Sequence, residues 1–496
     1  MHSIILKRKT YIILFLITLI SNASAQSYQT TNLVFDSKVF GDYRNISVYL
    51  PPSYFASNAT NYPVLYVLDT EVTNETVLSY FESEARLGTN IPEHIIVTVT
   101  LYPPSKFKPD LLPAVSIASS TSSQKVIDFF ESELVPFIRR NYRASSYKTI
   151  GGQQYGGLFA AYASLVRPDL ANGFIAIRPN LEWNNSFLKG LAKRTLKEQR
   201  DFKTNLFITS NQNKNKEAED FMYAVAGGFL SRKHTSGFII LFVMLMLLVM
   251  RMELRSRKFG SVTYNGVPFA LGVLAMPVCL YLISNYIPSN SNFQLRQFKE
   301  ESNATTEVAS YKWAMYRIFE NSRIPDGRIN KPSDVVNYKS KVLNYYGQLL
   351  PIPMEVWKKT IYANQDNHPL LSAIEYQVEQ HLPQAHEDFN YLFCNLLIQQ
   401  NKLQMAETVA VAYLRKNQYS YRNREVMARI NYEKKLFDAA LSDIQFSISM
   451  AKQQRARTYI LSELEEIQRR IENRSTLQYK PESNIKRNYS AGFEPI

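Results

Sequence analysis

The central motif of this sequence is Thr149-Ile150-Gly151-Gly152-Gln153-Gln154-Tyr155-Gly156-Gly157-Leu158-Phe159-Ala160, in which a β-branched strand end runs through a glycine-rich corner into an alanine-rich helix. In this context the motif G-x-S-x-G presents a serine at the top of an α/β sheet. The same register here has Gln154 at its centre. Glycines on both sides let strand and helix pack closely, so we expect Gln154 in a strained, exposed turn. Because a primary amide has no O–H or S–H for a base to activate, Gln154 is excluded as a nucleophile for acyl transfer.

The composition indicates a multidomain globular chain. Its 496 residues suggest about two or three domains, and 45% hydrophobic with 13% aromatic residues is enough for packed cores. The net charge of +14 is spread along the chain, which argues against nucleic-acid binding. The two cysteines, Cys279 and Cys394, lie in segments that we do not expect to meet. They predict neither a disulfide framework nor a metal site, and we expect no cofactor.

Residues 1–25 have the features of a secretory signal peptide. The basic residues 7–9 precede an apolar run over 11–20, and Ala23-Ser24-Ala25 offers small side chains for cleavage. The mature chain would then begin near Gln26, outside the cytoplasm. An uncleaved N-terminal anchor is the alternative interpretation.

The next part of the chain alternates strand and helix patterns. A helical spacing of apolar residues covers 123–141, and a second helix follows the central turn and ends at Val166. Short apolar or alternating runs predict strands at 45–50, 64–68, 95–100, 174–177, 206–209 and 293–298. Several of these runs are continuously apolar, as in parallel strands that are buried on both faces, so an α/β fold with a mainly parallel sheet is predicted.

Several motifs in the same order resemble those of the esterase D and enterochelin-esterase-like family. Besides the central turn, they are Arg44–Pro52, Tyr62–Asp69, Asp110–Pro113 and Arg167–Leu170. The likeness covers about residues 30–230 and 292–320. It implies the α/β-hydrolase fold and, in active members of the family, cleavage of carboxylic esters by a Ser-Asp/Glu-His triad.

Carried over position by position, the resemblance implies that the triad is absent. The nucleophile position is Gln154, the acid position in the loop after 206–209 is Asn211, and the histidine position is Asn303. Thr70 and Tyr155 fall in the region of the oxyanion donors. We interpret the three amides as a retired active site, because loss of even one triad member leaves only residual catalysis. The alternative is that they are ordinary surface amides in a shifted register.

Two apolar segments interrupt the esterase-like part and predict a transmembrane hairpin at 235–287. The segments 235–251 and 267–287 have no polar face, and the second matches the length that crosses a bilayer. Four basic residues against one acidic residue in 251–258 place the connection in the cytoplasm by the positive-inside rule. A buried helical hairpin is the alternative. We therefore expect localisation at the cell membrane, with the flanking domains on the periplasmic or extracellular side.

The C-terminal part is predicted to be a helical domain over 366–472. It follows the esterase-like domain, 26–325, and a proline-containing linker, 326–365, and it precedes a polar tail, 473–496. The run 401–407 repeats at 434–440, a separation of 33 residues, and resembles tetratricopeptide repeats. Such repeats present grooves for protein segments. A plain helical bundle is the alternative.

These features favour a membrane-tethered, esterase-like pseudoenzyme that binds an unidentified ligand or a protein partner. A second hypothesis is an active carboxylic ester hydrolase that uses another serine, with Ser122, Ser123 and Ser210 as candidates. None of these serines lies in an elbow turn. A third hypothesis is a scaffold in which the hydrolase fold serves as a spacer.

Overall fold

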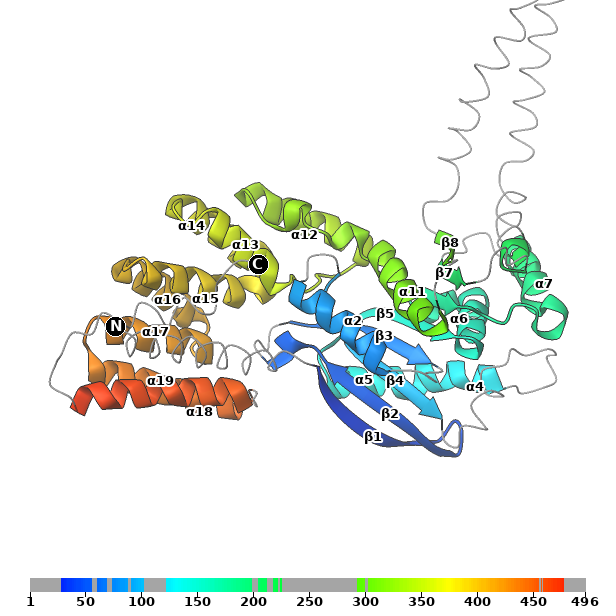
Figure 1. Ribbon diagram of the computed structural model, residues 1–496, viewed down its shortest axis with the longest axis horizontal. Helices are drawn as coiled ribbons and strands as arrows, with labels where there is room; N and C mark the ends of the chain where they lie inside the picture. The colour runs from blue at the N-terminus through cyan, green and yellow to red at the C-terminus, as the bar shows by residue number, and fades with distance from the viewer. Residues whose placement is uncertain are drawn as a thin grey trace, which may run out of the picture.

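The computed structural model describes residues 28–55, 60–68, 74–87, 91–101, 122–198, 204–211, 217–221, 224, 292–298, 302–454, 456 and 458–476. Two parts are visible, an α/β body and a module of helices beside it (Figure 1).

The body is built on one eight-stranded sheet with the order β1-β2-β4-β3-β5-β6-β7-β8. Strand β2 is antiparallel to both neighbours, and the strands from β4 to β8 are parallel to one another. The strands are β1 (Gln29–Ser37), β2 (Asp42–Leu50), β3 (Tyr62–Leu68), β4 (Ile95–Leu101), β5 (Ala144–Gln153), β6 (Gly173–Ile177), β7 (Asn205–Ser210) and β8 (Asn292–Gln297). All six predicted strands are confirmed, and the arrangement is that of an α/β-hydrolase-like fold.

Helices cover both faces of the sheet, which explains why β3 and β6 are buried along their whole length. One face packs against α2 (Asn74–Leu87) and α11 (Asn303–Ile318). The other packs against α4 (Ser122–Phe129), α5 (Val135–Asn141), α6 (Tyr155–Val166) and α7 (Trp183–Glu198). A π-helical turn, Phe130–Leu134, joins α4 to α5, so the helix predicted over 123–141 is present. Helix α6 ends at Val166, as predicted.

The C-terminal module consists of helices. They are α12 (Pro332–Tyr346), α13 (Met354–Ala363), α14 (His368–His381), α15 (Pro383–Gln399), α16 (Leu403–Lys416), α17 (Tyr421–Glu433), α18 (Phe437–Gln453) and α19 (Thr458–Thr476). The helical domain expected from the sequence is therefore present, and α19 extends into the segment expected as a tail.

Two turns of the module are structurally equivalent at a spacing of 34 residues. Asn401 (φ 57°) and Lys435 (φ 64°) both have left-handed backbones. In each turn the following residue donates its N–H to a carbonyl five residues earlier, at 2.8 Å. Ala406 and Ala440 are both fully buried. The register of 33 residues read from the sequence is thus wrong by one, because burial of the alanines sets the equivalence.

The sequence predicts a linker at 326–365, and this prediction is wrong, because the segment contains α12 and α13. Pro332 occupies the first turn of α12, where a missing N–H costs nothing, and Pro353 directly precedes α13. Both helices bury apolar side chains, with Trp357 of α13 fully enclosed. The prolines here start helices, whereas the sequence interpretation treated them as breaks.

A continuous apolar cluster joins the body to the module. Phe319 stacks on Tyr346 with ring centroids 5.7 Å apart, and Tyr147 of β5 contacts both rings, at 5.3 and 5.4 Å. The same cluster extends from the sheet as far as Ile430 in α17. Gln348 adds hydrogen bonds to β5, since its amide accepts from Ser146 Oγ at 2.7 Å. The boundary expected at residue 325 is therefore not a gap in the core.

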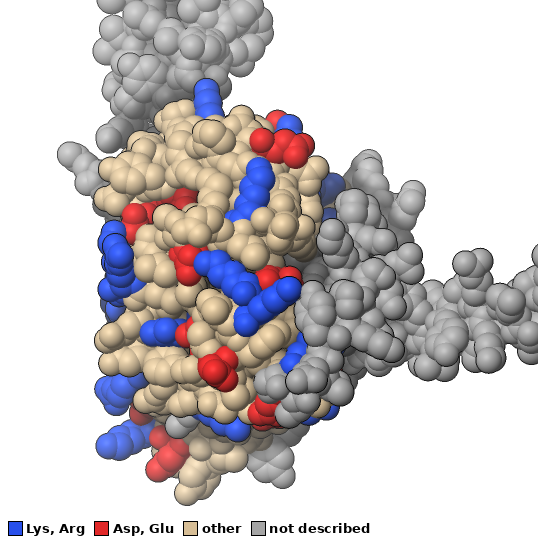
Figure 2. Space-filling view, turned by 90° about the vertical axis from the view of Figure 1, so that its left-hand side faces the viewer, with Lys and Arg blue, Asp and Glu red and all other residues tan. Residues whose placement is uncertain are grey.

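The end of the molecule formed by the module carries basic and acidic side chains interspersed (Figure 2). Several of them pair between helices, such as Lys416 with Glu379 and Lys434 with Glu407.

Within the described residues, no helix is long and apolar enough to cross a membrane. The segments 235–251 and 267–287, where the sequence predicts the transmembrane hairpin, lie outside these residues, as do the expected signal peptide, 1–25, and most of the tail.

Candidate functional site

The turn between β5 and α6 places Gln154 in a strained backbone conformation, with φ 50° and ψ −108°. Its N–H donates to Ile177 O at 2.9 Å, and its carbonyl accepts the N–H of Leu158 at 2.8 Å. A non-glycine residue with positive φ is uncommon and persists only where the surroundings impose it. The strain expected at Gln154 is therefore confirmed, but the residue is half-buried and not fully exposed as the sequence had predicted.

Close packing around the turn requires glycine on both sides of it. A Cβ atom on Gly152 would lie 2.8 Å from Leu68 O and 2.8 Å from Gly156 C. A Cβ on Gly157 would lie 2.9 Å from Ile177 O. Each distance is shorter than real Cβ contacts allow, and each neighbour is backbone. The glycines thus let α6 begin directly against the ends of β3 and β6, which fixes the position of Gln154.

Other strained residues lie near the same edge of the sheet. Arg178, directly after β6, has φ 45°, and the start of α7 carries a left-handed run. That run is Asn184 (φ 48°), Asn185 (φ 54°) and Ser186 (φ 57°). In the described part of the chain, the remaining non-glycine residues with positive φ lie in turns of the helical module and its approach. Backbone strain of this kind concentrates at functional sites.

The Arg178 side chain lies beside the turn. Its Nη2 donates to Gln153 Oε1 at 2.9 Å, and Gln153 is only 4% exposed. Burial lowers the pKa of Arg178 from its ordinary value, and the nearby carboxylate of Glu307 in α11 opposes this. The Nε of Arg178 is buried without a hydrogen-bond partner. The sequence interpretation missed both Arg178 and Glu307; a charged residue directly after a buried strand was the available signal.

Helix α11 supplies buried polar groups beneath this edge. Thr209 Oγ1 and Ser310 Oγ are 2.7 Å apart, and both residues are fully buried. Tyr311 packs its ring against Gly151, where a Cβ would lie 2.7 Å from the tyrosine Cε1. Burial, reinforced by Glu307, raises the pKa of Tyr311 well above its ordinary value. The floor of the site is therefore fixed by packing that tolerates little change.

The amides assigned from the sequence fall at one edge of the sheet. Gln154 follows β5, Asn211 follows β7, and Asn303 is the first residue of α11, which follows β8. The carboxyl ends of adjacent parallel strands form the usual ligand crevice of open α/β sheets. Tyr155 is the half-buried first residue of α6. Thr70 and the side chain of Asn303 lie outside the described residues.

The described histidines lie away from this edge. His94 is fully buried just before β4, between the rings of Phe81 and Phe319. Its Nδ1 is 2.5 Å from Pro92 O, and burial lowers the pKa of His94 to about 3. His368, His381 and His386 belong to α14 and α15. Neither these residues nor any other described group of His, Cys, Asp and Glu forms a cluster that could hold a metal ion.

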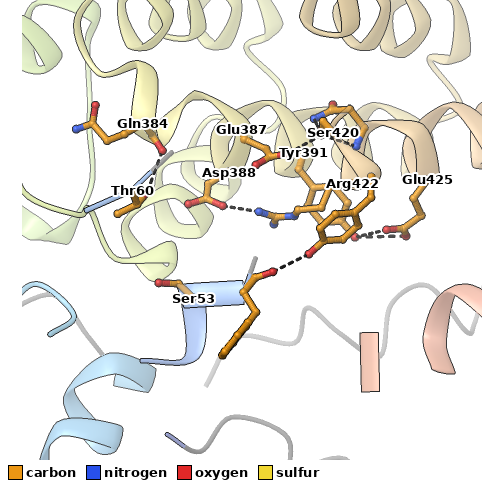
Figure 3. Close-up of polar contacts among 12 residues, drawn as sticks. Ser53, Thr60, Gln384, Glu387, Asp388, Tyr391, Ser420, Arg422 and Glu425 are labelled. Atoms are coloured by element: carbon orange, nitrogen blue, oxygen red, sulfur yellow. Dashed lines mark hydrogen bonds and ion pairs between the residues drawn. The ribbon is translucent and has the colours of Figure 1, made fainter. Parts of the chain in front are cut away.

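A small pocket, with a cavity volume of about 20 Å³, lies between the body and the module. The body contributes Ser53, Thr60, Tyr62 and Glu93, and the module contributes residues 351–354, Gln384, Ala385 and Asp388. Figure 3 shows polar contacts at and beside this interface, among them Thr60 Oγ1 donating to Gln384 O at 3.3 Å. The hydroxyl of Tyr421 donates to Phe55 O at 3.2 Å.

A buried polar ladder on α15 and α17 borders the pocket (Figure 3). Asp388 pairs with Arg422, which is 34 residues later, and Arg422 lies 4.4 Å above the ring of Tyr391. Tyr391 in turn contacts Glu425, also 34 residues later. Burial disfavours the charge on Arg422, but the surrounding carboxylates, led by Asp388, outweigh it and hold the Arg422 pKa above its ordinary value. Positions 34 residues apart on α15 and α17, the helices on either side of α16 in the chain, thus carry complementary groups.

Comparison with known proteins points to ester hydrolases. Residues 37–217 match the esterase family, described as "Putative esterase". The matched segment includes Gln154 and Asn211 and is well under half of the chain. A curated relative is the ferri-bacillibactin esterase BesA of Bacillus subtilis (strain 168), 38% identical over 61 residues, which are 12% of this chain and 21% of that protein. The chain thus matches about a fifth of the length of this relative.

Solved structures with a similar arrangement have low sequence identity. An IroE-like serine hydrolase from Shewanella oneidensis has a TM-score of 0.48 at 19% identity, covering 73% of this chain and all of that one. An uncharacterised protein from Capnocytophaga ochracea DSM 7271 has a TM-score of 0.43 at 12% identity, covering 90% of this chain and all of that one. The siderophore hydrolase EstB from Aspergillus nidulans has a TM-score of 0.38 at 16% identity, covering 59% of this chain and 94% of that one.

Proposed function

We propose that this chain is an esterase-like protein of the cell envelope that binds a ligand and does not cleave it. The ligand would bind at the elbow, by which we mean the turn between β5 and α6 that carries Gln154. The observation that carries the proposal is Gln154 in the strained turn, φ 50° and ψ −108°, where an esterase would present its nucleophile. An amide donates and accepts hydrogen bonds but cannot form an acyl intermediate. The strain remains although the nucleophile is missing, which supports a retained binding role.

The other triad positions support the same proposal. Asn211 and Asn303 carry amides where an acid and a general base are required, and no described histidine lies at the carboxyl edge of the sheet. Without a base, even a hydroxyl at position 154 would stay unactivated.

The setting proposed for this binding role is the outer side of a membrane. The segments 235–251 and 267–287 would form the tether, since the sequence there is apolar throughout. The helical module would bind a protein partner, and its spacing of 34 residues between equivalent contacts supports a tetratricopeptide-like array. The signal peptide and the basic connection at 251–258 support the orientation.

An active carboxylic ester hydrolase is the second candidate, because residues 37–217 match the esterase family. It would need a different nucleophile. Ser123 is completely buried in α4 and Ser210 is 2% exposed at the end of β7, so neither presents its hydroxyl to a substrate in the observed conformation. The side chain of Ser122 lies outside the described residues.

Hydrolysis of a short-chain chromogenic ester by the detergent-solubilised full chain tests the proposal. We expect no turnover by the unaltered protein and none by Gln154→Ser alone, which lacks a base. Activity that appears only in Gln154→Ser/Asn303→His would support the assigned register. The binding-only proposal would be refuted if the unaltered protein and the Gln154→Ala variant both hydrolyse the ester. Contaminating esterase must be excluded in this experiment.

A further inference from the structure

We propose that the ligand of the elbow carries a carboxylate and that Arg178 binds it. This inference rests on the proposed function, because it assigns a chemical class to the ligand of the same site. It follows from where Arg178 lies, which of its donors are used, and which charges surround it.

The backbone places Arg178 next to the elbow. Gln153 and Ile177 are paired in the parallel ladder of β5 and β6, so the residues that follow them, Gln154 and Arg178, are neighbours at the carboxyl edge. Hydrogen bonds fix both, from Gln154 N to Ile177 O at 2.9 Å and from Arg178 N to Thr209 O at 2.8 Å. Both have positive φ, 50° and 45°. Gln154 and Arg178 are therefore held side by side at this edge, and the Arg178 side chain is tied to Gln153, the residue before Gln154.

The Arg178 guanidinium has donors to spare. Arginine carries five N–H groups in a planar fork and has no acceptor. The fork is fixed at one point by Gln153 Oε1, 2.9 Å from Nη2. The Nε–H, by contrast, is buried without an acceptor. Such donors are rare, because they lose their hydrogen bonds to water and gain none in the protein. Arg178 as a whole is only half-buried, so a ligand carboxylate could accept from its remaining N–H groups, and a small rotation of the side chain would also bring the Nε–H within reach.

The charged residues named at this edge of the sheet are two arginines and one buried glutamate. Glu307 is 2% exposed and belongs to α11, so it supports the guanidinium from below the edge. Arg296, near the end of β8, is exposed and lies 5.1 Å from the ring of Phe298, so it adds a second positive charge to the carboxyl edge two strands away from β6. Gln154 offers an uncharged amide that can donate a further hydrogen bond. An uncharged ester could accept a hydrogen bond from Arg178 but would gain less from it than a carboxylate, so the inferred ligand resembles the acid product of an esterase.

The test compares a carboxylate with its uncharged ester on the full chain in detergent. Butyrate and methyl butyrate differ in charge but have similar apolar parts. We expect calorimetry or ligand-observed NMR to show butyrate binding, with affinity at least about tenfold weaker for methyl butyrate. Arg178→Gln should weaken butyrate binding by about tenfold or more, because it removes the charge and the fork. Arg178→Lys, which keeps the charge, should retain part of the affinity.

A matched control is Arg194→Gln on the exposed side of α7, which should leave butyrate binding unchanged. Thermal unfolding of each variant checks that the fold is intact. Equal binding of butyrate and methyl butyrate, undiminished butyrate binding by a folded Arg178→Gln, or binding of inorganic phosphate in place of butyrate would each overturn the inference. Binding of methyl butyrate alone, lost in Gln154→Ala, would overturn it and leave the proposed function standing. Ester turnover by the unaltered protein would instead remove the proposed function, while Arg178-dependent butyrate binding would still stand as product binding.

Discussion

Replacing Gln154 by glycine should stabilise the protein. With φ 50° and ψ −108°, Gln154 occupies a region that side chains with a Cβ rarely adopt. Such strain costs about 1–3 kcal/mol, and glycine would release it. The glycine also increases the conformational entropy of the unfolded chain, which lowers the free energy of unfolding by about 0.4–1 kcal/mol. The expected net gain is about 0.5–2 kcal/mol. Differential scanning calorimetry of the detergent-solubilised chain should show the unfolding transition rising by about 2–4 °C per kcal/mol gained.

The matched control is Asn180→Gly, since Asn180 is exposed near the same edge and does not have positive φ. It should lower stability by about 0.4–1 kcal/mol through the unfolded chain alone. If Gln154→Gly destabilises the protein as much as Asn180→Gly does, the turn stores no strain, and the argument that this conformation was kept for binding loses its basis.

Three further substitutions test the close packing at the turn, the Asp388–Arg422 ion pair within the module and the buried histidine. Gly152→Ala should destabilise the fold by about 2 kcal/mol or more in chemical denaturation, because the new Cβ would meet Leu68 O at 2.8 Å; an effect within about 0.5 kcal/mol would contradict the close packing at the turn. Arg422→Met leaves the half-buried Asp388 unpaired, so a loss of about 2–3 kcal/mol is expected, and the double variant with Asp388→Leu should recover much of it; equal losses in both would contradict a charge effect. Burial depresses the pKa of His94 to about 3, so its neutral form stabilises the fold above the unfolded pKa of about 6.5, and this contribution is lost as the pH falls toward 3. His94→Phe should flatten the fall in stability between pH 7 and pH 4, and an unchanged slope would show that other groups cause it.

Much of the body could be predicted from the sequence because its signals are local. Continuous apolar runs such as 64–68 and 174–177 become strands buried on both faces, and the glycine spacing around Gln154 predicts the strained turn. Strand β1 and helix α2 were not predicted individually. In β1 exposed and half-buried residues alternate, so its apolar signal is weak.

The rest depends on contacts between distant segments. Arg178 gains its role from Gln153, 25 residues earlier, and from Glu307 on α11, and no local pattern encodes either contact. The prolines at 332 and 353 are ambiguous in sequence, since proline both ends helices and starts them. The repeat register was corrected by one residue from the burial of Ala406 and Ala440 and from the left-handed turns at Asn401 and Lys435.

The aromatic contacts of Tyr147, Phe319 and Tyr346 have a mechanical consequence. Tyr147 belongs to the same strand that ends at the elbow, and Tyr346 ends the first helix of the module. A chain truncated at residue 325 would expose the sides of Tyr147 and Phe319 that now pack on Tyr346. We therefore expect the two parts to unfold together and to resist separation by proteases. A protein partner bound by the helices would then be held at a fixed distance and orientation relative to the turn at Gln154, because the two parts are joined rigidly and not by a flexible linker.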